Sequence, residues 1–233
     1  MNFFIVVLFL CFFIFLFSLY FFAHDDLTLF KKDASMDRLF NIAFVLSFVS
    51  LFTARIFYVL LNPSTHFLNP LVFFLFPYFP GLSLTGGVVG GAFFLFIILR
   101  MKKMPLGRIF DFFSLSFLTC LPVGFLGFFL LSHTNLISLS PLVILAFYTL
   151  LFIMFSFFLL PRLLKGKFRD GTLGLLFLLS FSLFSLVEKI VDKKAYFGIE
   201  EITLVLLFVI SLGLLAKREE LVSKFRNIKK ISK

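Results

Sequence analysis

The sequence predicts an all-α integral membrane protein with seven transmembrane helices, and three observations support this fold class. Hydrophobic residues make up 61% of the 233 residues, and the mean hydropathy is +1.11, which excludes a soluble globular domain. Apolar runs of about 20 residues, the length that a helix needs to cross a bilayer, recur along the whole chain. Basic residues are concentrated in alternate loops, which is typical of a multi-pass membrane protein.

Seven apolar segments are predicted to cross the membrane in turn. They are residues 2–23, 39–61, 82–99, 109–131, 141–160, 171–187 and 199–216. The first has no basic start and a longer apolar run than a cleaved signal peptide, so we interpret it as a retained span. Residues 1–216 would then form the transmembrane domain, and residues 217–233 a basic cytoplasmic tail.

The charges of the loops predict an N-terminus outside and a C-terminus in the cytoplasm, because basic loops stay on the cytoplasmic side. With this orientation 18 of the 22 Lys and Arg residues lie inside, and Arg55 lies within a span. The remaining three, Lys189, Lys193 and Lys194, lie outside. Contact with anionic lipid explains the net charge of +10, so we expect no nucleic-acid partner.

The connection at residues 63–80 is rich in proline and contains an apolar patch at residues 71–76. This patch is too short to cross a bilayer, so we expect it to lie along the outer surface or to re-enter partway. Either arrangement would bring the start of the third span to the outer interface. Cys11 and Cys120 both fall inside spans, so neither a disulfide nor a metal site is indicated, and we expect no cofactor.

The third span opens with GLSLTGGVVGG, which has five glycines in residues 81–91. One interpretation is a helix start at Ser83, Thr85, Gly86 and Gly87 whose free backbone amides favour an anion. The alternative is a face of small residues that lets two helices pack closely. The sequence alone leaves both open.

Arg55 lies within the second span, about a third of its length from the predicted outer end, and Tyr58 follows it. Such a cation can extend toward the interface or cap a backbone carbonyl. It can also hold a phosphate through paired hydrogen bonds in a cavity open to the outer leaflet. Both interpretations stay open.

These residues resemble the prolipoprotein diacylglyceryl transferases of bacterial membranes. ARIFYVL at residues 54–60 is similar to the family segment A-R-x-x-Y-V-L, and GLSLTGGVVGG is similar to G-x-S-x-H-G-G-x-x-G, with Thr85 at the histidine. Asp111 falls in a segment that resembles the family's aspartate segment. GFLGFF at residues 124–129 stands where the family has G-R-x-G-N-F, and Glu188 begins a segment similar to E-x-x-R.

The resemblance implies transfer of diacylglyceryl from phosphatidylglycerol, or another anionic phospholipid, to the lipobox cysteine of a preprolipoprotein in the bacterial cytoplasmic membrane. That chemistry needs a group that takes the thiol proton and cations that stabilise the departing phosphate. Four family positions instead hold Thr85, Phe125, Phe128 and Val191. His133 is a hypothetical replacement base, and Asp111 is a second weak candidate.

Three functions remain open at this point: a divergent transferase, a catalytically silent paralogue that binds phospholipid or a membrane partner, and a small transporter or channel. If the family fold is kept, we expect five residues to approach one another in a cavity open toward the outer leaflet. They are Arg55, Tyr58, Ser83, Thr85 and Asp111. Gly86 and Gly87 would complete the contacts to the phospholipid headgroup.

Overall fold

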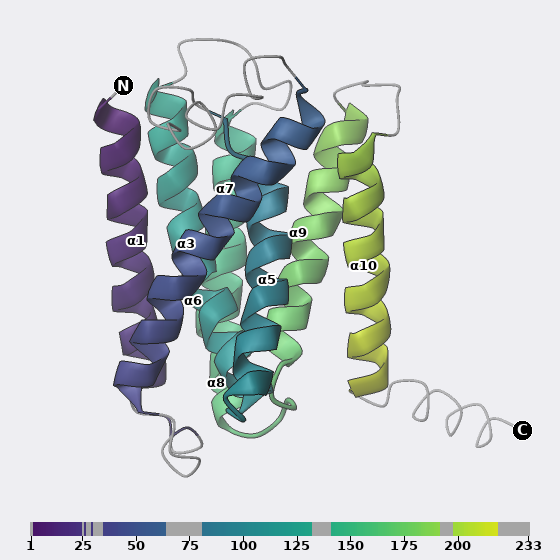
Figure 1. Ribbon diagram of the computed structural model, residues 1–233. Coiled ribbons are helices and arrows are strands. Elements are labelled where there is room, and N and C mark those ends of the chain that lie inside the picture. The colour runs from purple at the N-terminus through teal and green to yellow at the C-terminus, as the bar shows by residue number, and fades with distance from the viewer. Residues whose placement is uncertain are drawn as a thin grey trace, which may run out of the picture.

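The computed structural model describes residues 2–24, 26, 29, 35–63, 81–131, 141–191 and 198–218. In these residues all regular structure is helical. Seven helices are long and apolar enough to cross a membrane, which confirms the predicted fold class. Figure 1 shows them side by side in one bundle.

The helices follow the predicted spans closely. They are α1 (Asn2–Ala23), α3 (Met36–Leu61), α5 (Leu84–Met101), α6 (Leu106–Leu131), α7 (Pro141–Ile153) with its continuations η2 (Met154–Leu159) and α8 (Leu160–Leu164), α9 (Thr172–Val191) and α10 (Ile199–Arg218). α3 and α6 each begin three residues earlier than predicted. Hydropathy marks the hydrocarbon boundary, whereas a helix continues into the polar interface as long as its backbone bonds are made.

The fifth span contains a π-helical segment that the apolar pattern did not reveal. At the end of η2 the amide of Leu160, the next residue, donates to the Phe155 carbonyl, five residues earlier. Pro161 follows and has no amide hydrogen, so the regular α-helical ladder cannot continue unchanged through this point. The π-helical bonding lets the span continue into α8 without a break.

Consecutive helices run up and down through the bundle, with α1 beginning at the upper end in Figure 1 and α10 ending at the lower end. The upper end is the side that the loop charges predict to face outward. α6 occupies the centre, where it packs against α1, α5, α7 and α9, while α3 lies along α5 and α10 lies along α9. Three pairs of neighbours, α1 with α6, α3 with α5 and α9 with α10, therefore make the most extensive contacts.

The glycines of α5 let it pack closely against α3. A Cβ atom at Gly86 would overlap the side chain of Phe57, and one at Gly90 would overlap Thr53. Only residues without a side chain fit there, because the backbone of α5 approaches α3 too closely for more atoms. The close-packing interpretation of the glycine stretch is therefore confirmed.

An ionic cluster centred on the buried Arg108 joins helix ends at the lower end of the bundle. The Arg108 guanidinium lies 2.5 Å from Asp26 and 3.3 Å from Asp170. The side chains of Arg108 and Asp26 are only 5% and 2% exposed. Because a buried charge is costly unless paired, this cluster fixes how α6, the residues after α1 and the segment before α9 meet.

Candidate functional site

Arg55 and Tyr58 hold the residue that leads into α5. Arg55 is 3% exposed, and its Nη1 donates to the Gly81 carbonyl at 2.7 Å. The guanidinium carbon lies 5.8 Å from the centre of the Tyr58 ring, within cation–π range. The carbonyl-capping interpretation of Arg55 is thus what the structure shows.

The backbone at Gly81 requires glycine for two reasons. Its φ angle is +155°, a region that other residues rarely adopt, and a Cβ atom there would overlap the Tyr58 ring. Two residues later, the Ser83 amide donates to the Ala54 carbonyl at 3.0 Å. The structure therefore brings Arg55, Tyr58 and Ser83 together at the upper end of α3.

Ser83 caps the start of α5 and uses amides that were expected to be free. Its hydroxyl accepts from the Gly86 amide at 3.2 Å, and its carbonyl accepts from the Gly87 amide at 3.0 Å. The expectation that these two glycine amides are free to bind an anion is wrong. The cap itself explains why a serine precedes the helix, since its side chain satisfies one of the first amides.

Thr85 joins a polar group that spans three helices. Thr85 is only 4% exposed. Its hydroxyl donates to Oε1 of Glu200, the second residue of α10, at 2.9 Å. The Lys189 Nζ, near the end of α9, lies 2.6 Å from Oε2 of the same carboxylate. Each oxygen of Glu200 thus has a different partner.

Asp111 does not join these residues. It is fully buried, and its two oxygens accept from the amides of Gly171 at 2.5 Å and Gly174 at 2.8 Å. It therefore caps the start of α9 at the lower end of the bundle, whereas Thr85 lies at the upper end, in the first turn of α5. The prediction that Asp111 approaches Arg55 and Thr85 is wrong.

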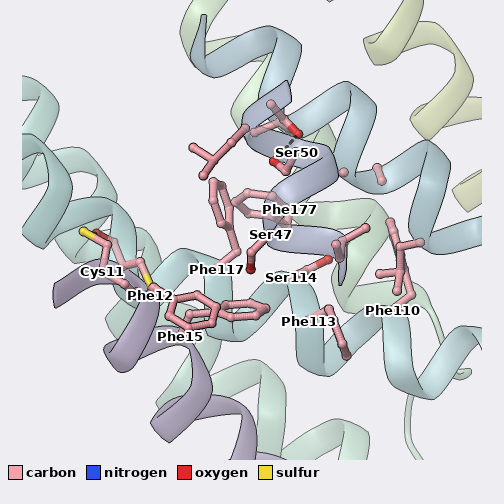
Figure 2. Close-up of a pocket in the computed structure, with 18 of the residues that line it drawn as sticks. Cys11, Phe12, Phe15, Ser47, Ser50, Phe110, Phe113, Ser114, Phe117 and Phe177 are labelled. Atoms are coloured by element: carbon pink, nitrogen blue, oxygen red, sulfur yellow. Dashed lines mark hydrogen bonds between the residues drawn. The ribbon is translucent and has the colours of Figure 1, made fainter. Parts of the chain in front are cut away.

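An apolar cavity of about 230 Å³ lies between α1, α3, α5, α6 and α9. Figure 2 shows phenylalanine rings around it, among them Phe15, Phe117 and Phe177 from three different helices, with the hydroxyl of Ser50 at its edge. That hydroxyl donates to the Gly87 carbonyl at 2.9 Å. The same small-residue face of α5 that packs on α3 also forms part of the cavity wall.

The predicted site residues border this cavity without lining it. Ser50 and Leu51 are part of its wall, and Arg55 follows one helical turn further toward the upper end of α3. Arg55, Tyr58, Ser83 and Thr85 are absent from the residues that line it. This cavity is therefore not the polar cavity that the sequence predicts around Arg55, Tyr58, Ser83, Thr85 and Asp111.

The other family positions hold apolar side chains that are exposed or pack against the core. Phe125 stacks on Tyr148, with ring centres 5.0 Å apart and planes 11° from parallel. Phe128 and Val191 are 46% and 54% exposed at the surface of the bundle. None of the three supplies a polar atom to a site. His133 and residues 64–80 lie outside the described residues.

Sequence reasoning did not identify Glu200 and Lys189 as site residues. In the sequence, Lys189 is only one of three basic residues on the predicted outer side, whereas most basic residues lie on the predicted cytoplasmic side. The signal that could have found this pair is Glu200 in the first turn of the next span. Charges near the ends of adjacent spans tend to pair, so Glu200 is an expected partner for Lys189.

Comparison with known proteins places the chain in a family. The profile for prolipoprotein diacylglyceryl transferase matches residues 2–216. Comparison with curated proteins returns no match. The matched segment begins with α1 and extends into the last turn of α10, so that it takes in all seven spans. The chain belongs to the prolipoprotein diacylglyceryl transferase family.

Proposed function

We propose that the protein transfers the diacylglyceryl group of phosphatidylglycerol to the lipobox cysteine of preprolipoproteins. The reaction forms a thioether and releases glycerol phosphate, and it would take place in the bacterial cytoplasmic membrane. The observation that carries the proposal is the family match over residues 2–216. It covers the whole membrane domain and not a single motif.

The arrangement of apolar and polar groups supports a phospholipid substrate. The cavity of about 230 Å³ is smaller than the roughly 300–1,000 Å³ of sites that enclose whole small molecules. It suits a segment of one acyl chain, and the rest of the lipid would remain in the bilayer. The cation of Arg55 and the polar group around Glu200 lie further toward the upper end, where the headgroup of an outer-leaflet lipid would sit.

A catalytically silent paralogue that binds phospholipid is the second candidate, and one observation favours it. Three positions where family members carry polar residues here hold Phe125, Phe128 and Val191, which are packed on aromatic rings or exposed to lipid. Losing one donor to a developing negative charge costs about 100- to 1,000-fold in rate. Family membership leaves the transporter or channel alternative without a supporting observation.

Complementation separates the two candidates. The gene would be expressed in a bacterial strain depleted of its own transferase, with an established transferase as positive control and empty vector as negative control. We expect growth and lipid-modified lipoproteins. Absence of both, with the protein present in the membrane at the level of the positive control, would reject transferase activity and support the silent paralogue.

A further inference from the structure

The polar group formed by Thr85, Glu200 and Lys189 has the composition of a reaction centre. It combines a carboxylate from α10, an ammonium from α9 and a hydroxyl from α5. The ammonium and the hydroxyl each lie within hydrogen-bond distance of the Glu200 carboxylate. Thr85 stands where the family motif has histidine. The chain therefore places a carboxylate directly beside the position from which a polar family residue has been lost.

The exposure of this group distinguishes it from a purely structural ion pair. The side chains of Lys189 and Glu200 are 28% and 19% exposed, whereas Arg108 and Asp26 in the cluster at the lower end are 5% and 2% exposed. The Arg108–Asp26 pair is closed to a substrate, although Asp170 beside it is 39% exposed. In the upper group both members of the ion pair are partly exposed, so a lipid headgroup or a peptide can reach them. A partly exposed pair also adds little to stability, so stability alone is a weak reason to keep it.

We propose that Glu200 is the base that takes the thiol proton and that Lys189 is the cation that receives the departing phosphate. This proposal rests on the transferase function proposed above. Thr85 would act as a positioning residue, because its hydroxyl holds Oε1 of Glu200 in place. The polar chemistry would thus have moved from the family positions to the facing ends of α9 and α10.

The proposed step balances without a further reactant. The lipobox thiol gives its proton to the Glu200 carboxylate. The sulfur then forms a bond to the carbon of the diacylglyceryl group that carries the phosphate. The bond from that carbon to the phosphate oxygen breaks, and its electron pair leaves with glycerol phosphate. Protonated Glu200 no longer holds Lys189 by charge, so the ammonium can pair with the phosphate. Glu200 then returns its proton to water.

The first test measures product formation by purified protein in phosphatidylglycerol vesicles with a lipobox peptide. Glu200→Gln keeps the size of the side chain and an oxygen acceptor, but it cannot take the proton. We expect kcat to fall about 100- to 10,000-fold, the usual effect of losing a general base, with little change in KM for the lipid. Glu200→Asp should recover part of the rate.

A matched control and an alkaline rescue separate chemistry from structure. Glu201→Gln changes the adjacent carboxylate, which accepts from the Gly198 amide at 2.8 Å, and should leave the rate unchanged. A free thiol ionises near pH 8.5, so the rate of Glu200→Gln should rise toward the wild-type rate as the pH approaches 9. A purely structural defect would not be rescued in this way.

The second variant addresses the cation. Lys189→Met should lower kcat by about 100- to 1,000-fold, as for loss of one group that stabilises developing negative charge. Lys189→Arg keeps the positive charge and should restore most of the rate. If Glu200→Gln does not fold, the two Lys189 variants and Glu200→Asp still test the proposal. Lys189→Arg and Glu200→Asp each keep both charges of the ion pair, so their rates can be compared with the rate of Lys189→Met.

The outcomes distinguish this inference from the function on which it rests. If wild-type protein modifies the peptide while Glu200→Gln and Lys189→Met retain its rate, the inference is overturned and the transferase function stands. If wild-type protein gives no product while an established transferase does in the same vesicles, the transferase function fails, and the inference fails with it.

Discussion

A buried arginine fastens the start of α5 to α3. Its side chain donates to the Gly81 carbonyl, and the Tyr58 ring fills the space that a Cβ atom at Gly81 would take. The hydrogen bond is charge-assisted and partly buried, so an unpaired carbonyl there would be costly. Arg55 thereby positions α5, the helix that carries Thr85.

Replacing this arginine should destabilise the protein. We expect Arg55→Met to lower the free energy of unfolding by about 1–3 kcal/mol, because the partly buried Gly81 carbonyl loses a charged donor. The measurement is reversible unfolding in detergent micelles. Arg100→Met, which changes an exposed arginine in the last turn of α5, is the control and should have little effect. Equal stability of the two variants would contradict the role given to Arg55.

The contacts of single residues could be predicted only in part. The proximity of Arg55 to Ser83 followed from the family resemblance and is present in the structure. The position of Asp111 was wrong, because the groups it caps lie 60 and 63 positions further along the chain. The contacts of Glu200 with Thr85 and Lys189 were missed, because hydropathy does not show which charges at helix ends face one another.

At the scale of elements, the small-residue face of α5 determines how closely α3 approaches. Gly86 and Gly90 contact side chains of α3 where no added atom fits. Helix pairs in membranes gain little from the hydrophobic effect, since lipid is as apolar as the side chains, so close backbone packing carries their association. The glycine stretch is thus explained by packing without any bound anion.

Adding one methyl group to this face should weaken the contact between the two helices. We expect Gly90→Ala to lower the free energy of unfolding by about 1–3 kcal/mol, the usual effect of overpacking, because the new Cβ overlaps Thr53. Gly213→Ala on α10 is the matched control, since a Cβ there meets no atom within 4 Å. It should be neutral or slightly stabilising. Unfolding in micelles would compare them, and an equal loss would contradict the account.

The helices themselves were predictable from the sequence, but their ends and irregularities were not. Every span appears as a helix within a few residues of its predicted limits. Hydropathy reports burial in lipid, so it could not show that α3 begins at Met36 in polar sequence. The π-helical segment before Pro161 was hidden as well, because it changes the backbone bonding and leaves the composition unchanged.

At the scale of the whole molecule, polar groups separate into two layers. The lower end holds the cluster of Arg108, Asp26 and Asp170, in which the Arg108–Asp26 pair is buried. The upper end holds the group of Thr85, Glu200 and Lys189, in which the Lys189–Glu200 pair is partly exposed. The apolar cavity lies between them. This arrangement fits a lipid whose acyl chain enters the bundle while its headgroup meets the upper polar group.

The charges of the loops predict the orientation of the molecule, and this prediction can be tested. Seven crossings with basic residues concentrated on one side predict that the upper end faces outward and that α10 ends in the cytoplasm. A fluorescent protein fused after Lys233 should therefore be fluorescent, and alkaline phosphatase fused at the same point should be inactive. The reverse pair of results would contradict the orientation and would place the proposed site on the cytoplasmic side.

The most direct test of the transferase account is the mass of a lipobox peptide after incubation with the purified protein in phosphatidylglycerol vesicles. We predict that the peptide gains one diacylglyceryl group, bound to its cysteine through a thioether, and that glycerol phosphate appears in equal amount. A peptide of unchanged mass, under conditions in which an established transferase modifies it completely, would contradict the account.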